Sequence, residues 1–283
     1  MWFDSPSDVS LRLAAVDYLS DDAISTSVYL AAALGKPLLV EGPAGVGKTQ
    51  LAKAVAASTG SDLVRLQCYE GLDEARALYE WNYKKQLLRI QATSADDDIF
   101  SEEFLLERPL LKAIRAERPT VLLIDETDKA DVEVEGLLLE LLSDFQVTIP
   151  ELGTIEATTK PYVVLTSNAT RELSEALKRR CLYLHIEYPT PERERDIVLA
   201  QVPAITEALA EQLARTVATL RSLELKKAPS VAETVDWANT LLALGRDDLD
   251  EATVAGTLGV VLKHASDQTR AIKELGLPDV ADR

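Results

Sequence analysis

The feature that most constrains the fold is a glycine-rich segment, GPAGVGKT at residues 42–49, which directly follows an apolar run at residues 37–40. It fits the pattern G-x-x-x-x-G-K-[ST], in which glycines let backbone N–H groups surround a phosphate while the lysine reaches the β and γ phosphates. The pattern requires a strand before the loop and a helix after it, and residues 50–57 are good helix formers. The alternative is an ordinary glycine-rich turn. The predicted phosphate-binding residues are Gly42, Pro43, Ala44, Gly45, Val46, Gly47, Lys48 and Thr49, of which Thr49 is placed to hold Mg²⁺.

The rest of the chain alternates short apolar runs with helical stretches. With 283 residues and 47% hydrophobic content, it is long enough for one large domain or for a large and a small one. The alternation predicts an α/β domain with a mostly parallel, five-stranded sheet covered by helices. Residues 145–158 instead read as strand, turn and strand, which predicts a hairpin beside that sheet. The five predicted strands cover residues 37–40, 63–66, 121–124, 162–166 and 182–186.

Composition becomes helical near Thr190, and no strong strand pattern follows. We therefore expect an α/β domain at residues 1–189 and a small all-helical domain at residues 190–283. Within the first domain, the three- and four-residue spacing of apolar residues between Leu72 and Ile90 predicts one core-facing helix. The acidic run at residues 96–98 is read as a solvated loop rather than a metal site.

Composition also excludes several classes of function. A formal charge of −17 argues against nucleic acid as a partner, because duplex binding requires basic residues that displace counter-ions. Cys68 and Cys181 are isolated, so neither a disulfide framework nor a zinc site is expected. Without a membrane-spanning apolar run or a signal-like beginning, we expect a cytoplasmic protein with no membrane span.

A second motif pairs with the glycine-rich loop. Residues 121–124 are apolar and end in Asp125 and Glu126, as in a buried strand that delivers carboxylates at its carboxyl end. Asp125 would bind Mg²⁺, and Glu126 would polarise the water that attacks the γ-phosphate. The alternative is a strand that enters a solvated turn, but an upstream phosphate loop favours the catalytic interpretation.

Two further positions have functional and structural interpretations. Asn168 follows an apolar strand, where its amide would position the attacking water or contact the γ-phosphate, or would only cap a turn. Arg179 and Arg180 precede the last strand and would stabilise charge in a neighbouring subunit's site, or would simply form a solvated helix end.

These motifs, taken in order, resemble a known family. GPAGVGKT, LLIDE, the strand ending in Asn168 and ALKRRC resemble AAA+ ATPases. The hairpin FQVTIPELGTIEAT and the region inserted before LLIDE look like the MoxR branch. YEGLDEARALYEW, FSEEFLLERPLL, IDETDKAD and LSDFQVTIPELGTI are most similar to CoxD-like members. The resemblance extends from about Tyr18 to Leu244.

The resemblance implies a P-loop core with strand order 5-1-4-3-2, a helical lid and a ring, commonly a hexamer, with ATP between subunits. It implies an arginine finger acting in trans, for which Arg180 is the first candidate and Arg179 the second. One departure concerns the lid: many MoxR proteins carry an SPR-like arginine, whereas this chain has KKAPSV at residues 226–231. Lys226 and Lys227 would substitute as point charges or form a solvated pair.

The function implied by the resemblance is Mg²⁺-dependent ATP hydrolysis that drives chaperone-like remodelling of a protein client, often with a von Willebrand factor A domain partner. CoxD-like members are associated with metallocentre assembly in molybdenum-containing carbon monoxide dehydrogenase. An ATP-dependent assembly switch with slow hydrolysis is the main alternative, although Glu126 argues against a site that only binds. A DNA-directed motor is a third hypothesis, which the acidic charge disfavours.

Overall fold

The structure is a computed structural model that describes residues 2–92 and 99–278, so the predicted loop at residues 96–98 lies outside the described residues. The chain divides into two compact units. The first contains Met1–Gly42 and Lys48–His185, and the second contains Pro43–Gly47 and Ile186–Arg283. Among the described residues, no helix has both the length and the apolar character that crossing a membrane requires.

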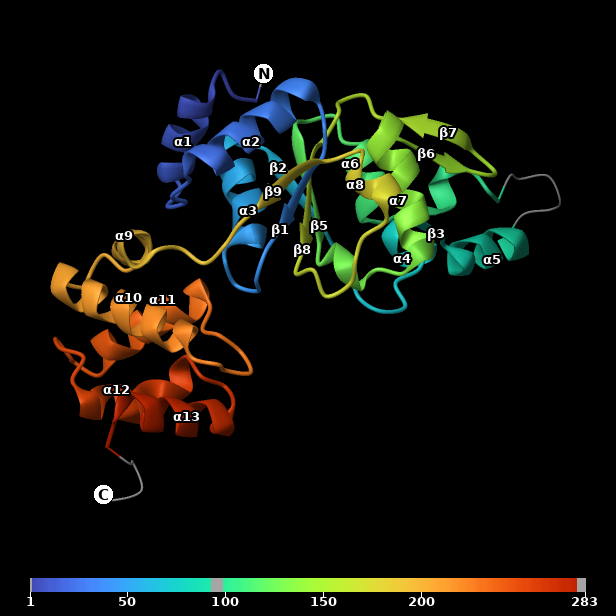
Figure 1. The fold of residues 1–283 in the computed structure, drawn as a ribbon. Helices are drawn as coiled ribbons and strands as arrows, with labels where there is room; N and C mark the ends of the chain where they lie inside the picture. The colour runs from blue at the N-terminus through green and yellow to red at the C-terminus, as the bar shows by residue number, and fades with distance from the viewer. Residues whose placement is uncertain (1, 93–98, 279–283) are drawn as a thin grey trace. The chain divides into compact units, whose positions relative to one another are not determined.

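The first unit is built on a five-stranded parallel sheet, as predicted (Figure 1). Its order is β2-β5-β8-β1-β9. If these five strands are numbered 1 to 5 in chain order, the sheet reads 5-1-4-3-2 from the β9 edge. This is the expected order. β5 and β8 are buried along their whole length because neighbouring strands and helices cover them. The strands are β1 (Leu38–Glu41), β2 (Asp62–Gln67), β5 (Thr120–Asp125), β8 (Tyr162–Ser167) and β9 (Leu182–His185).

Helices cover this sheet, and their ends follow local sequence signals. Asp21 accepts a hydrogen bond from Ile24 N at the start of α2 (Asp22–Leu34), and Gly35 ends that helix with a left-handed backbone. α3 (Lys48–Thr59) begins inside the glycine-rich motif, so the predicted strand, loop and helix are all present. The other described helical segments of this unit are α1 (Pro6–Ala14), α4 (Glu74–Ala77), α5 (Tyr83–Ala92), η1 (Glu102–Phe104), α6 (Pro109–Ile114), η2 (Thr127–Lys129), α7 (Val132–Asp144) and α8 (Glu175–Lys178).

Two small two-stranded antiparallel sheets accompany the main sheet. The predicted one is present as β6 (Gln146–Ile149) and β7 (Gly153–Glu156). Gly153 has a φ of 80°, a conformation that glycine adopts without a steric penalty. The second pair, β3 (Tyr79–Trp81) with β4 (Leu105–Glu107), was not predicted, because its strands are short and far apart in sequence.

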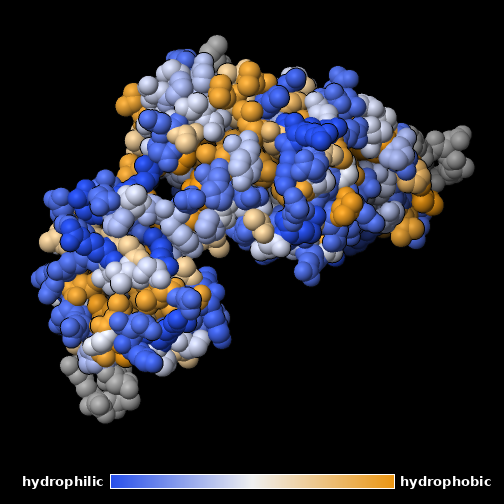
Figure 2. All heavy atoms as spheres, in the orientation of Figure 1, coloured by the Kyte–Doolittle hydropathy of each residue, from blue (hydrophilic) through white to orange (hydrophobic). Residues whose placement is uncertain are grey.

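The predicted single core-facing helix between Leu72 and Ile90 is wrong. The segment forms α4 (Glu74–Ala77), then β3, then α5 (Tyr83–Ala92), because Asp73 caps a new short helix and β3 pairs with β4. In α5 the polar Gln86 is 4% exposed and donates to Ile99 O at 2.6 Å, whereas Leu87 is 59% exposed. Tyr83, Leu88 and Ile90 are also exposed, and Figure 2 shows apolar surface where α5 lies. Helical spacing therefore predicted a helix here but not which face it buries.

The second unit contains helices and no strand among its described residues, as the sequence indicates. Its apolar core centres on Trp237, whose Nε1 donates to Thr257 Oγ1 at 2.8 Å. The buried Glu194 carboxylate accepts Arg221 Nη2 at 2.8 Å and Thr234 Oγ1 at 2.6 Å, so this buried charge is paired. The described elements are α9 (Pro191–Gln201), α10 (Glu207–Ser222), α11 (Val231–Ala243), α12 (Glu251–Thr257), η3 (Leu258–Val260) and α13 (Ala265–Leu275).

The KKAPSV segment, which has lysines where many MoxR proteins carry an SPR-like arginine, leads into α11. Ser230 and Glu233 make a reciprocal capping box, with Ser230 N donating to Glu233 Oε2 at 2.8 Å. Lys227 Nζ lies 3.4 Å from Glu233 Oε1, so this lysine is ion-paired rather than merely solvated. Within the same unit, Val231 N donates to Gly45 O at 3.1 Å. The division into a nucleotide-binding domain and a lid at 189/190 stays a prediction.

Candidate functional site

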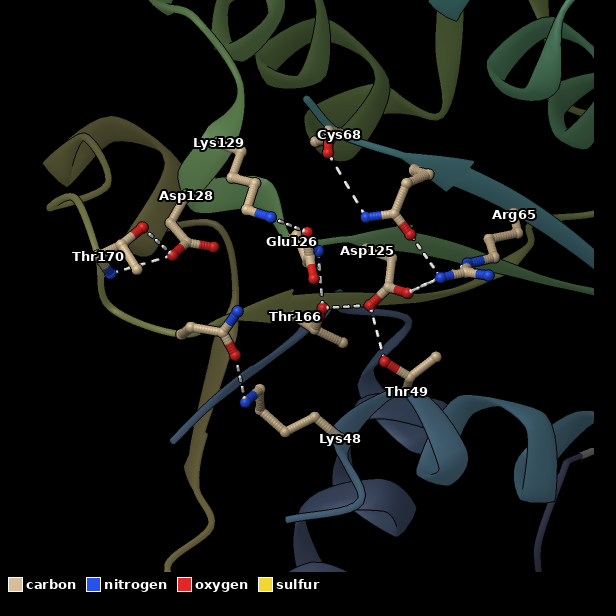
Figure 3. Close-up of polar contacts among 12 residues, drawn as sticks. Lys48, Thr49, Arg65, Cys68, Asp125, Glu126, Asp128, Lys129, Thr166 and Thr170 are labelled. Atoms are coloured by element: carbon tan, nitrogen blue, oxygen red, sulfur yellow. Dashed lines mark hydrogen bonds and ion pairs between the residues drawn. The ribbon is translucent and has the colours of Figure 1, made fainter. Parts of the chain in front are cut away.

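Three neighbouring strands deliver polar side chains to the same edge of the sheet. β5, β8 and β1 are adjacent and parallel, so their carboxyl ends meet. Asp125 is the last residue of β5, Asn168 follows β8, and Lys48 and Thr49 begin the helix after β1. Figure 3 shows Thr49 beside Asp125 and Lys48 on the same helix as Thr49.

The glycine-rich loop has backbone angles that favour glycine. Gly42, Gly45 and Gly47 have φ values of 154°, 77° and 99°. Residues with a side chain adopt such angles only with strain. The backbone angles at these three positions therefore explain why the motif has glycine there. The loop leads directly into the N-terminus of α3, where backbone N–H groups and the helix dipole favour an anion.

Lys48 is a buried cation at this edge. Its Nζ donates to Gly42 O at 2.7 Å and to Asn168 Oδ1 at 2.8 Å. Burial lowers the pKa of Lys48, while the nearby carboxylates of Asp128, Asp125 and Glu126 act in the opposite direction. A buried ammonium directly after the glycine-rich loop suits a phosphate, so the chain's own residues fit a nucleotide here.

Asp125 is a buried carboxylate surrounded by donors (Figure 3). Its Oδ1 accepts Thr49 Oγ1 at 2.9 Å and Thr166 Oγ1 at 2.6 Å. Its Oδ2 accepts Arg65 Nε at 3.1 Å and Arg65 Nη2 at 2.5 Å. A threonine hydroxyl beside a carboxylate supplies the oxygen ligands that Mg²⁺ prefers, so Thr49 and Asp125 fit this ion.

Glu126 has a left-handed backbone, with a φ of 56°, which is uncommon outside glycine. Its N–H donates to Thr166 Oγ1 at 2.9 Å, so the same threonine orients both acidic residues. Its carboxylate pairs with Lys129 Nζ at 2.6 Å, and this hydrogen bond raises the pKa of Lys129. The conformation costs free energy that the surrounding bonds must offset, as is common at functional sites.

Asn168 lies where the sequence places it. Its Oδ1 accepts Lys48 Nζ, which links the end of β8 to the phosphate loop. The next residue, Ala169, has a φ of 56°, and its N–H donates to Ser167 Oγ at 2.9 Å. At this turn the Asn168 side chain contacts Lys48, and its role toward water or the γ-phosphate stays a prediction.

Asp128 is a site residue that the sequence reading missed. Its Oδ2 accepts Thr170 N at 3.0 Å and Thr170 Oγ1 at 2.5 Å (Figure 3). Burial opposes ionisation of this carboxyl, but the hydrogen bonds from Thr170 outweigh it, and the pKa of Asp128 is lowered. Glu135 holds the same loop, because its carboxylate pairs with Arg171 at 2.5 Å. These bonds fix the loop after Asn168 to the segment after Asp125.

Arg65 and Thr166 were also missed, although each carries a signal in the sequence. Arg65 is a cation within a predicted strand, and Thr166 is a polar residue in a run that is otherwise apolar. The alternation of side chains along a strand predicts, by itself, that Arg65 faces solvent. Only the parallel pairing of β2 with β5 brings Arg65 to Asp125.

The two arginine-finger candidates differ in their contacts. Arg180 Nε donates to Ser143 Oγ at 2.5 Å, and its Nη1 donates to Ala176 O at 2.9 Å. Arg179 is exposed, and its side chain makes no hydrogen bond or ion pair with the described residues. Neither arginine contacts the described acidic residues of the site, which is compatible with action on another subunit.

A glycine-rich phosphate loop, a buried strand whose last residue and the next are acidic, and a polar residue after the adjacent strand together define a P-loop nucleotide-binding domain. The chain matches the family described as AAA domain (dynein-related subfamily) over residues 37–181, which is just over half of its length. It belongs to this family. Proteins of this class are AAA+ ATPases that bind nucleotide and typically assemble into rings.

The chain is also similar to several individual proteins. An uncharacterized protein of Staphylococcus haemolyticus is 24% identical over 237 residues, covering 80% of this chain and 85% of the relative. A Caenorhabditis elegans protein named "Probable 26S proteasome regulatory subunit 6B" is 31% identical over 160 residues, which cover 56% of this chain and 34% of that protein. Among solved structures, a Thermotoga maritima RuvB mutant is 18% identical with a TM-score of 0.48, covering 98% of this chain and 72% of that chain.

Proposed function

We propose that this chain is a Mg²⁺-dependent ATPase whose hydrolysis cycle remodels a protein client. The observation that carries the proposal is the convergence of Lys48, Thr49, Asp125, Glu126 and Asn168 at one edge of the sheet. A cation for phosphate, oxygen ligands for a metal and a base for water are the groups that phosphoryl transfer requires.

Each residue has a distinct role in this proposal. Lys48 binds the β and γ phosphates, and Thr49 and Asp125 hold the metal site. Glu126 orients and polarises the attacking water, while Asn168 positions that water or contacts the γ-phosphate. Mg²⁺, when bound, neutralises charge on the phosphate oxygens.

A ring, commonly a hexamer, would complete the site with an arginine from the neighbouring subunit. Arg180 is the first candidate from its place before β9. Arg179 is the second candidate, and it is exposed with no side-chain bond to the described residues. An arginine that reaches into the next site stabilises charge developing on the transferred phosphoryl group.

The finer assignment rests on sequence resemblance. We propose that the chain belongs to the MoxR branch and is closest to its CoxD-like members. The resemblance supports a protein client, a von Willebrand factor A domain partner and a role in metallocentre assembly in a molybdenum enzyme such as carbon monoxide dehydrogenase. A cytoplasmic location stays a prediction.

One contact favours a second candidate function, an assembly switch with slow hydrolysis. Glu126 is ion-paired with Lys129 at 2.6 Å, and a base held by a cation is less available to water. Replacing Lys129 separates the two functions: Lys129→Met should increase ATP turnover if this pair restrains Glu126. If the rate is unchanged, the Glu126–Lys129 pair does not restrain hydrolysis and no longer supports the assembly switch.

Phosphate release by the full-length protein tests the proposal. We expect hydrolysis with ATP and Mg²⁺, its loss on addition of EDTA, and its loss in Glu126→Gln with ATP binding retained. Glu133→Gln, an exposed acid at the start of the nearby α7, is the matched control and should behave like the wild type. Wild-type turnover in Glu126→Gln would contradict the assigned base.

A further inference from the structure

The carboxylate of Asp125 has no acceptor position left among the described residues. Two hydroxyl groups, from Thr49 and Thr166, occupy Oδ1, and two N–H groups of Arg65 occupy Oδ2 (Figure 3). An ionised carboxylate has about four lone-pair sites, so these four donors use its capacity. Any further donor must replace one of them.

Arg65 reaches this carboxylate from the edge strand of the sheet. β2 pairs with β5 so that Gln67 lies opposite Asp125, and Arg65 is two residues earlier on the same face. The guanidinium also donates to Gln67 Oε1. The side chain of Asp125 is 3% exposed and that of Arg65 is 46% exposed, so the arginine is the partner in contact with solvent.

We propose that Arg65 is an exchangeable counter-ion of Asp125 that holds the carboxylate when no metal is present and withdraws at least one N–H when Mg²⁺ binds with nucleotide. The inference rests on the proposed ATPase function. Mg²⁺ keeps several of its waters in protein sites, and each such water needs an acceptor. Asp125 gains a free acceptor only when one of its four donors leaves.

Arg65 is the donor best placed to leave. Thr166 is buried and also accepts Glu126 N–H, so its movement would disturb both acidic residues. Thr49 belongs to the phosphate loop and is itself a predicted metal ligand. The guanidinium is half exposed on a long side chain, so water can replace the hydrogen bonds that it gives up.

This arrangement makes metal capture depend on nucleotide. Arg65 neutralises the charge of Asp125, so the site attracts a bare divalent cation weakly. Nucleotide phosphates add the negative charge that the cation needs to compete with the guanidinium. Arg65 is therefore a positioning residue that sets the affinity of the site for its metal.

Mn²⁺ binding by the full-length protein tests the inference without measuring catalysis. Free Mn²⁺ is followed by electron paramagnetic resonance, with and without saturating ADP, in the wild type and in Arg65→Met. Removing the competing ion pair should tighten Mn²⁺ binding in the ADP complex by about fivefold, which corresponds to about 1 kcal/mol. Arg65→Met should also bind Mn²⁺ measurably without ADP, where the wild type binds it weakly.

Two variants serve as controls. Arg118 Nη1 lies 3.7 Å from Asp62 Oδ2, at the opposite end of β2 and β5 from Asp125. Arg118→Met therefore removes a positive charge far from the site and should leave Mn²⁺ binding unchanged. Arg65→Lys keeps the positive charge and should remain close to the wild type. Metal-free ADP affinity should be equal in all of these proteins, which shows that the phosphate loop is intact.

Unchanged or weaker Mn²⁺ binding in Arg65→Met, with ADP affinity retained, would overturn the inference and leave Arg65 as a support for Asp125. If Arg65→Met does not fold, Arg65→Gln carries the same comparison. A wild-type protein that binds neither ADP nor Mn²⁺ would contradict the proposed function itself, so the two failures are distinguishable.

Discussion

At the scale of single residues, Lys48 has the most specific task. Its ammonium is buried and bonded to Gly42 O and Asn168 Oδ1, so its replacement removes the cation that the phosphates would meet. We expect Lys48→Ala to weaken ATP binding by about a hundredfold, or about 3 kcal/mol. Isothermal calorimetry measures this, with Lys53→Ala, an exposed lysine of the same helix, as the control. Retained affinity in Lys48→Ala would remove the assignment of the phosphate loop.

Asp128 gives a pH-dependent prediction. Its pKa is lowered in the folded protein, so the unfolded chain binds a proton more readily, and the stability that Asp128 contributes rises with pH. The contribution is present above its unfolded pKa of about 3.9 and is lost as pH falls through the folded value. Asp128→Asn should therefore lower the thermal midpoint at pH 7 more than at pH 3. An equal decrease at both values would show that ionised Asp128 adds no stability.

The sequence identified some of these residues and missed others for one physical reason. Lys48, Asp125 and Glu126 belong to contiguous motifs whose chemistry can be read locally. Arg65 reaches the site only through strand pairing, because it is 60 residues from Asp125 in sequence. Asp128 accepts its hydrogen bond from Thr170, which is 42 residues away in sequence.

At the scale of elements, the alternation of apolar runs predicted the five strands and the β6–β7 hairpin, because each has its own local pattern. The same approach failed between Leu72 and Ile90. Apolar spacing cannot reveal that Asp73 starts a new helix or that β3 finds its partner β4 beyond residue 100. Burial depends on these long-range pairings, so α5 buries Gln86 and leaves Leu87 and Leu88 exposed.

The orientation of α5 leads to a stability prediction. Leu87 is exposed, so Leu87→Ser should change the free energy of unfolding by about 0.5 kcal/mol or less. Leu110 in α6 is fully buried, and Leu110→Ala should cost about 2–5 kcal/mol because it leaves a cavity. Urea unfolding of the two variants compares them directly. A large loss in Leu87→Ser would mean that this helix faces the core, as its spacing suggested.

At the scale of the whole molecule, ring assembly would bring an arginine of one subunit to the phosphate of another. Mixing Arg180→Ala subunits with Lys48→Ala subunits should restore part of the ATPase activity, because some interfaces then pair an intact phosphate loop with an intact finger. The same experiment with Arg179→Ala shows which arginine acts. Phosphate release is measured for each protein alone and for the mixtures. If neither mixture exceeds its separate components, no arginine of the pair acts in trans.

The most direct test of a ring-forming ATPase is the mass of Glu126→Gln in solution, measured by light scattering without nucleotide and with ATP and Mg²⁺. This variant should retain bound ATP, since Lys48, Thr49 and Asp125 are unchanged. We predict that with ATP the measured mass becomes one defined multiple of the chain mass. That result would support a site completed between subunits. A monomer under both conditions, with ATP bound, would contradict the ring and the arginine finger.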